Sequence, residues 1–205
     1  MIKFGQYLSA IASVNGLGDN IEWLFYPGML QDSWEKWWDD FALRHASHEG
    51  VDICFFRTSS DKSSLENKGL AENKDLAKTL ERLDKNADIP AMDKGIVLNI
   101  ADDFLGQTLV LTQDVLAREK LDDFSPKLLF VYSHLEIKKG IVPGCRVEKG
   151  QIIGQVFNSN RKPSKLFPHL HLSCIELTGK NPLKNLNWDL FSDRKRVNLI
   201  NPVFI

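Results

Sequence analysis

Four of the five histidines in this chain stand in three short contexts that could build a metal site. His48 and Asp52 are separated by three residues, His134 follows a Tyr-Ser pair at the end of a predicted strand, and His169 and His171 flank a single leucine. Imidazole nitrogens and carboxylate oxygens are the usual protein ligands of zinc besides cysteine sulfur. The three contexts together therefore predict a metal centre assembled from distant parts of the chain.

The His-Leu-His-Leu run is best explained as a half-buried strand. Side chains alternate between the two faces of a strand, so His169 and His171 would share one face. Leu170 and Leu172 would then face the other way and fill the core. This arrangement presents two imidazoles side by side on one surface.

The His48 to Asp52 segment needs a different geometry. In an extended chain these residues would lie about 13 Å apart. Two ligands of one zinc ion need donor atoms within about 3–4 Å, because each bond is roughly 2.0–2.2 Å long. The segment must therefore fold back, and Gly50 is the residue that could permit it. Asp52 would lie on the buried strand predicted for residues 51–56, and His48 in the loop before it.

Cysteine usage favours a catalytic over a structural metal. Cys54, Cys145 and Cys174 are scattered and form no Cys-x-x-Cys pair, whereas structural zinc is usually closed by four ligands that include cysteines. With three ligands, a water in the open position has its pKa lowered towards about 7 and becomes a nucleophile. The remaining histidines could accept its proton or stabilise an oxyanion. We expect buried free thiols, with a Cys54–Cys174 bridge as the alternative.

The elements that must position these residues change character along the chain. After the capping residue Asp32, four aromatic residues at helical spacing predict a helix packed on the core, or an aromatic platform for sugar or peptide: Trp34, Trp37, Trp38 and Phe41. Residues 57–88 are polar, with a helix expected over 74–83, either as a surface decoration or as a flap. After Pro90, short apolar runs with frequent glycines predict a mainly antiparallel sheet or sandwich.

Composition excludes several functional classes. The 205 residues carry a formal net charge of -1, so a nucleic-acid partner is not expected. The basic run at residues 194–196 is interpreted as a solvated turn. The chain has no apolar window of about 18 residues, so no transmembrane segment is expected. Residues 4–14 have the outline of a signal peptide but are interrupted by polar residues, which favours an ordinary N-terminal segment.

The order of the motifs resembles the lysostaphin-type (LytM-like) zinc metalloendopeptidases. The motifs are His-x-x-x-Asp, Tyr-Ser-His-Leu, the glycine-rich hairpin of residues 142–154, His-Leu-His-Leu, and the closing Asn-Pro of residues 201–202. Residues 89–97, Ile-Pro-Ala-Met-Asp-Lys-Gly-Ile-Val, also resemble a strand of that family. The resemblance covers roughly residues 44–57 and 88–205.

The resemblance implies a role for each site residue. One Zn²⁺ ion per chain would be held by His48, Asp52 and His171, with His134 and His169 as the catalytic histidines. The family hydrolyses peptide bonds in peptidoglycan stem peptides or crosslinks, in the cell envelope. Its fold is an antiparallel β sandwich-like core, here with a helical N-terminal segment and a helical insertion.

The implied organisation has an aromatic-rich segment at 1–43 and a peptidase domain at 44–205 with an insertion at about 57–88. The chain departs from the family at this insertion, at residues 157–160, and at Ser173, where the family often has glutamate. These changes are interpreted as lying in the groove walls, so they affect substrate preference. The alternative function is a catalytically silent scaffold or activator of cell-wall hydrolases, although all five site positions are kept.

Overall fold

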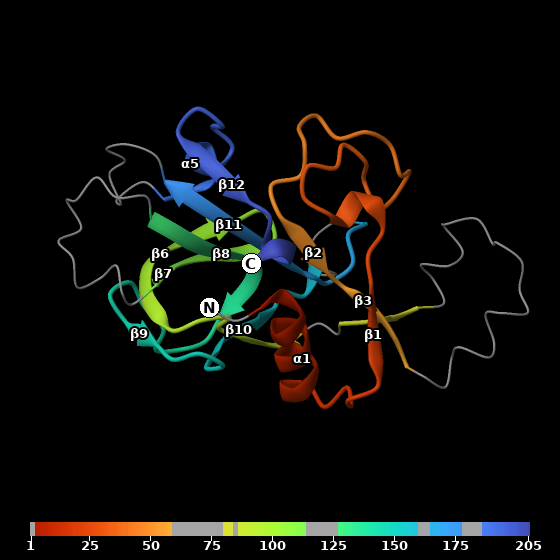
Figure 1. Ribbon diagram of the computed structural model, residues 1–205, viewed down its shortest axis with the longest axis horizontal. Helices are drawn as coiled ribbons and strands as arrows, with labels where there is room; N and C mark the ends of the chain where they lie inside the picture. Colours follow the sequence, from red (N-terminus) through yellow and green to blue (C-terminus); the bar gives the residue numbers. More distant parts are fainter. Residues whose placement is uncertain (1–2, 59–79, 84–85, 114–126, 160–164, 178–185) are drawn as a thin grey trace, which may run out of the picture.

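The computed structural model describes residues 3–58, 80–83, 86–113, 127–159, 165–177 and 186–205 (Figure 1). Antiparallel strands are the main regular structure in these residues, with short helices at the two ends of the chain. The prediction of a mainly β fold is therefore confirmed. The division of the chain near residue 43 stays a prediction.

Nine strands in the described part of the chain form one sheet. Its central strands run in the order β11, β8, β7 and β6, and each pairs antiparallel with its neighbour. They span Leu170–Leu177, Lys127–Ile137, Gly106–Gln113 and Gly95–Asp103. The other strands are β12 (Val197–Ile200), β9 (Arg146–Val147), β2 (Val51–Ile53), β10 (Ile152–Val156) and β5 (Asp88–Pro90).

A second, three-stranded sheet lies beside the large one (Figure 1). It consists of β1 (Ile21–Leu24), β3 (Phe55–Thr58) and β4 (Glu81–Arg82). A short 3-10 helix, η1 (Pro27–Met29), follows β1. Because β3 follows β2 after one residue, Cys54, this small sheet is joined directly to the strand that carries Asp52.

The large sheet buries apolar side chains on both faces. Along β11, Leu170 and Leu172 belong to the main core, as the alternation predicts, whereas Ile175 and Leu177 belong to a second cluster on the other face. Helix α5 (Trp188–Phe191) contributes two buried residues to that second cluster. His171 on β11, and His169 just before the strand begins, therefore lie on the face that α5 covers.

Helix α1 (Phe4–Val14) is an integral part of the main core. Tyr7 and Ile11 are fully buried, and the Tyr7 hydroxyl donates a hydrogen bond of 3.0 Å to the Pro90 carbonyl. The C-terminal 3-10 helix η5 (Pro202–Phe204) contacts α1, so the two ends of the chain meet. In the described part of the chain, none of the helices has the length and apolarity needed to cross a membrane.

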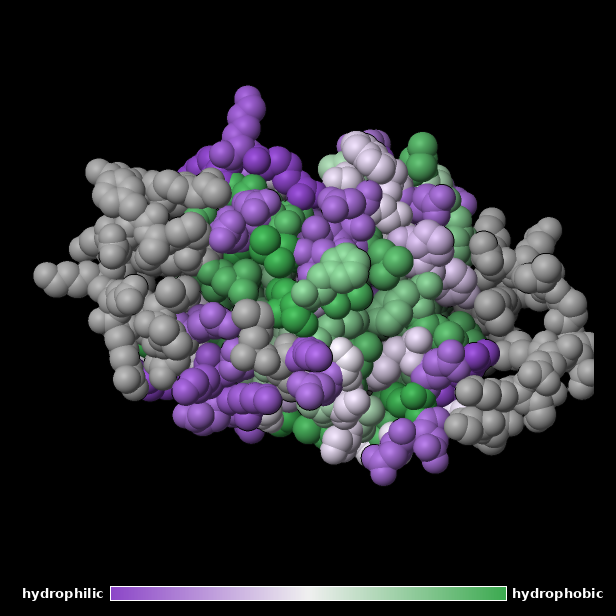
Figure 2. Space-filling model, in the orientation of Figure 1, coloured by the Kyte–Doolittle hydropathy of each residue, from purple (hydrophilic) through white to green (hydrophobic). Residues whose placement is uncertain are grey.

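Figure 2 shows how hydrophobic and hydrophilic residues are distributed on one face of the molecule. Hydrophobic residues gather across the middle of this face, and hydrophilic residues lie above them, over α5 and β12. Arg194, Lys195 and Arg196 are exposed in the turn before β12. The interpretation of this basic run as a solvated turn is confirmed.

The aromatic helix predicted after Asp32 is wrong. The chain instead reverses direction there, with an isolated bridge between Glu35 and Leu43 and a 2.8 Å backbone hydrogen bond from Arg44 to Trp34. Asp39 and Phe41 both have φ of 56°, in the left-handed region, which makes this reversal. The aromatic residues consequently share no face: Trp37 is fully buried and Trp34 is 56% exposed.

The helix predicted over residues 74–83 lies mainly outside the described residues. Its described end is not helical, because Glu81–Arg82 forms β4 at the edge of the small sheet. Phe55 pairs with Arg82 and Phe56 with Glu81. Pairing with an available strand edge has taken precedence over the helical spacing of the leucines. The role of the insertion as a flap stays a prediction.

Candidate metal and catalytic site

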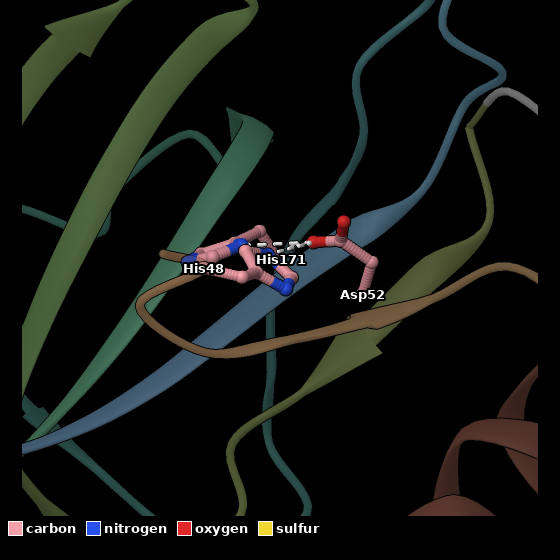
Figure 3. A group of neighbouring side chains, drawn as sticks. All are labelled: His48, Asp52 and His171. Atoms are coloured by element: carbon pink, nitrogen blue, oxygen red, sulfur yellow. Dashed lines mark hydrogen bonds and ion pairs between the residues drawn. The ribbon is translucent and has the colours of Figure 1, made fainter. Parts of the chain in front are cut away.

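Three of the predicted residues converge on one point (Figure 3). His48 Nε2 lies 3.1 Å from Asp52 Oδ1 and 3.0 Å from His171 Nδ1, and His171 Nδ1 lies 2.8 Å from the same carboxylate oxygen. All three residues are at most 5% exposed. This group could hold a metal ion.

Three segments bring these side chains together. Asp52 on β2 is the register partner of His171 on β11, so strand pairing sets that contact. His48 comes from the loop that leads into β2 (Figure 3). The site is therefore built on the edge between β2 and β11 rather than on one continuous motif.

Gly50 permits this arrangement because it has no side chain. Its φ lies outside the left-handed region, so Gly50 does not provide the backbone turn that was expected of it. A Cβ atom at position 50 would overlap the Leu172 carbonyl oxygen and lie 2.6 Å from Ser173 Oγ. The loop after His48 passes so close to β11 that only glycine fits.

The second nitrogen of each of these rings has its own partner. His48 Nδ1 lies 3.1 Å from the Leu30 carbonyl oxygen, which can only accept, so Nδ1 carries a proton and Nε2 faces Asp52. His171 Nε2 lies 2.8 Å from Ser173 Oγ, which leaves Nδ1 facing the site. Such partners fix the orientation of metal-binding histidines.

His169 and His134 stand on the same wall. His169 Nδ1 donates to the Phe167 carbonyl at 2.8 Å, and its Nε2 lies 3.7 Å from Asp52 Oδ1. The His134 ring is 4.8 Å from that of His169 and 5.9 Å from that of His171, centre to centre. The structure thus brings together all five residues that the sequence predicted.

His134 reaches this wall through a β-bulge. Between Tyr132 and Leu135, both in the main core, β8 has two residues opposite one of β7. Ordinary alternation would point His134 into that core, because it is two residues from Tyr132. Its φ of 64° instead accompanies the extra residue, which lets His134 share the face of His171. His134 lies inside β8 and not at the strand end, as the sequence had suggested.

The electrostatics of the cluster suit a cation. Burial alone would raise the pKa of Asp52, but His48, His169 and His171 outweigh it and hold that pKa well below its usual value. Burial lowers the pKa of His169 to about 3, and it also lowers the pKa of His171. At neutral pH Asp52 is thus an ionised carboxylate and His169 and His171 are neutral imidazoles, which are the metal-binding forms of these side chains.

The donor set fits zinc. A tetrahedral ion with bonds of roughly 2.0–2.2 Å needs donor atoms about 3.3–3.6 Å apart. The separations of 2.8–3.1 Å are shorter than that spacing by roughly 0.2–0.8 Å. Two imidazoles and one carboxylate are also a known ligand set of catalytic zinc, and they leave one position open.

Sequence reasoning missed several residues that contact the cluster. The Trp37 indole Nε1 donates a 2.6 Å hydrogen bond to Asp52 Oδ2, and Asp103 Oδ2 lies 2.9 Å from His134 Nδ1. Ser173 contacts His171, so the interpretation of this position as a groove wall is wrong. Only Ser173 had a usable signal, because it lies two residues after His171 and so on the same strand face.

The cysteines are outside the site. All three lie in the described part of the chain and are free thiols, as expected, so the alternative Cys54–Cys174 bridge is absent. Burial raises the pKa of both Cys54 and Cys174. Neither therefore has the low-pKa thiolate that a nucleophile or metal ligand needs.

Comparison with known proteins gives similarity to solved structures only. No family model matches the chain, and no curated protein matches it. The catalytic domain of a mutant of the prophage-encoded M23 protein EnpA from Enterococcus faecalis is 16% identical, with a TM-score of 0.39, and covers 87% of this chain and 92% of that one. Lysostaphin in solution is also 16% identical, with a TM-score of 0.39, and covers 77% of this chain and 50% of that one. The function proposed below rests on the side chains described above.

Proposed function

We propose that this chain is a zinc-dependent endopeptidase that hydrolyses peptide bonds, in peptidoglycan stem peptides or crosslinks. The observation that carries the proposal is the convergence of His48, Asp52 and His171, with His134 and His169 on the same wall of one cleft. A metal site made only to stabilise the fold would not need two further buried histidines beside it. Peptidoglycan as the substrate rests on the resemblance of the sequence motifs.

In this proposal His48 Nε2, Asp52 Oδ1 and His171 Nδ1 hold one zinc ion. When bound there, zinc lowers the pKa of a water molecule and polarises the scissile carbonyl group. The chain's part is to fix the orientation of both ligand imidazoles. Leu30 and Ser173 do this through the opposite ring nitrogens.

His134 is the better proton carrier of the two remaining histidines. Its Nδ1 faces the Asp103 carboxylate, which stabilises an imidazolium ring, and its Nε2 is left for the reacting groups. It can accept a proton from the attacking water and return it to the amine that leaves. His169 Nδ1 is committed to Phe167, so neutral His169 presents a lone pair at Nε2.

The cleft walls are where the substrate would lie. Trp38 and Arg44 are among the lining residues, with the Arg44 guanidinium 4.7 Å from the centre of the Trp38 ring. Phe104 and Trp188 also line the cleft, and Phe104 is 62% exposed beside His134. Apolar and aromatic walls around a polar centre are typical of sites that bind organic ligands. These side chains would offer contacts to the substrate.

Hydrolysis of purified peptidoglycan tests this proposal. New amino groups and released muropeptides are measured by mass spectrometry for the zinc-loaded wild type, His171→Ala and His134→Ala. His45→Ala, at an exposed position, is the matched control. We expect cleavage by the wild type and the control alone. Stoichiometric zinc without hydrolysis of any peptidoglycan tested would instead favour the scaffold function.

A further inference from the structure

We propose that Asp103 is a positioning residue that fixes the tautomer and orientation of His134. This inference rests on the proposed function, in which His134 carries a proton. Asp103 is the last residue of β6. Its role would be to keep the proton on Nδ1 of His134, so that Nε2 meets the reacting groups as a lone pair.

The contact is close and buried. Asp103 Oδ2 lies 2.9 Å from His134 Nδ1, and the two side chains are 2% and 8% exposed. The Nδ1–H direction is not aligned for a full hydrogen bond. Catalytic contacts are often poorly aligned before substrate binds and tighten in the complex. The Asp103 carboxylate and His134 Nδ1 are thus within hydrogen-bonding distance, and a small rotation of the side chains would align them.

Asp103 is itself held by two donors. The Phe104 backbone N–H donates to Oδ1 at 2.6 Å, and the Thr108 hydroxyl lies 3.2 Å from Oδ2. The Trp188 indole Nε1 donates to Thr108 Oγ1 at 3.1 Å, which ties this network to the helix that covers the histidine face. Both carboxylate oxygens are therefore used as acceptors.

The charge on Asp103 is kept by these same contacts. Burial alone would raise the pKa of Asp103, but contact with His134 and the Phe104 N–H outweighs burial and lowers it. An ionised carboxylate accepts at both oxygens and donates at neither. It can therefore only favour the Nδ1–H tautomer of the ring beside it.

The backbone of His134 explains why a side-chain partner is needed. The bulge, in which His134 has a left-handed φ, brings this residue beside the other histidines. There its ring makes edge-to-face contacts with the rings of Phe104 and His169. Such contacts restrain the plane of a ring but do not distinguish its two nitrogens. Among the described residues, Asp103 is the charged group that makes this distinction.

The Asp103→Asn variant tests the proposal. Both carboxylate oxygens of Asp103 face hydrogen-bond donors. An asparagine at this position has only one oxygen, so its NH₂ group would face a donor, either the Phe104 N–H or the Thr108 hydroxyl and His134 Nδ1–H. We expect about a 10–100-fold loss in kcat with little change in KM and unchanged zinc content. The neighbouring, exposed Asp102→Asn is the matched control and should keep wild-type kcat.

A double-variant comparison separates positioning from a structural role. In the His134→Ala background, Asp103→Asn should cause no further loss, because its effect passes through His134. A further loss of the same size would show that Asp103 acts on the fold or on another residue. Wild-type kcat in the Asp103→Asn single variant would overturn the proposal outright.

A spectroscopic readout keeps the test independent of activity. Imidazole ¹⁵N chemical shifts in the metal-free protein distinguish the two tautomers of His134. We expect Nδ1–H in the wild type and in Asp102→Asn, and a shift towards Nε2–H in Asp103→Asn. An unchanged Nδ1–H tautomer in Asp103→Asn would contradict the proposal. If the wild type hydrolyses no peptide, the proposed function fails, and this measurement still decides the role of Asp103.

Discussion

At the scale of single residues, the site depends on what holds each side chain as much as on the histidines themselves. His48, His169 and His171 each have one ring nitrogen engaged by a carbonyl or hydroxyl oxygen, and the other nitrogen turned to the site. The histidines and Asp52 were predictable, because residues of these types at such spacings are rare by chance. Leu30 and Phe167 were not, since a backbone carbonyl leaves no trace in the sequence.

Substitution of Trp37 tests the contribution of the residues that hold the site's side chains in place. Trp37→Phe keeps most of the buried ring but removes the 2.6 Å hydrogen bond to Asp52. We expect zinc affinity to fall about 10–100-fold while the fold is retained. Competition with a chelator measures the affinity, and circular dichroism measures the fold. Trp34→Phe, at an exposed position, is the control and should bind zinc as the wild type does.

His134 allows the roles of ligand and proton carrier to be separated. It is not a member of the group whose donor atoms converge, which consists of His48, Asp52 and His171. His134→Ala should therefore keep stoichiometric zinc and lose most of the hydrolytic rate, about 10²–10⁴-fold. Zinc analysis of the purified variant, alongside the rate, measures both. Loss of the metal would show that a ligand has been misassigned.

At the scale of elements, two local irregularities build the site from regular strands. The bulge in β8 turns His134 away from the core, and the close passage at Gly50 brings His48 over β11. The bulge was not visible in the sequence, which predicted the alternation of β11 correctly but placed His134 at a strand end. Gly50 was singled out in the sequence, but for a turn and not for a close approach to β11. The aromatic helix was wrong for a related reason, because left-handed residues at Asp39 and Phe41 interrupt a pattern judged by spacing alone.

Gly50→Ala tests the close passage. The new methyl group would overlap the Leu172 carbonyl and Ser173. We expect destabilisation of about 1–3 kcal/mol and weaker zinc binding, because the His48 loop must move away from β11. Urea denaturation of the metal-free protein measures the first effect. Gly5→Ala, where a Cβ meets nothing within 4 Å, is the control and should not lower stability.

At the scale of the whole molecule, the large sheet is a two-faced support. One face carries the main core with α1, and the other carries a second cluster with α5 and, at one end, the histidines. A mainly antiparallel β fold was predictable from short apolar runs and frequent glycines. The way in which the N-terminal segment reaches the site through Leu30 and Trp37 was not, because those contacts join residues distant in the sequence.

The buried histidines make the metal-free fold sensitive to acid. In the folded state the pKa of His169 is about 3 instead of 6.5, and that of His171 is also lowered. Between pH 6.5 and about pH 3 these histidines bind protons in the unfolded chain but not in the folded one. Acid therefore favours unfolding. The low pKa of Asp52 acts in the same direction below about 3.8.

We therefore expect the unfolding free energy of the metal-free protein to fall as the pH drops from 6.5 towards 3. The loss should reach about 2–4 kcal/mol. Urea denaturation at several pH values measures it. His169→Ala removes one of the groups responsible and should give a shallower dependence on pH. A free energy that stays constant over this range would contradict the assigned environment of His169.

The central claim is that one zinc ion is held by His48, Asp52 and His171, and X-ray absorption at the zinc edge tests it most directly. The zinc-loaded wild type should show only nitrogen and oxygen neighbours at roughly 2.0–2.2 Å, with the outer-shell signal of imidazole. His171→Ala should lose stoichiometric zinc or show a weaker imidazole signal. A sulfur neighbour at roughly 2.3 Å, or a wild type that binds no zinc at pH 7, would contradict the account.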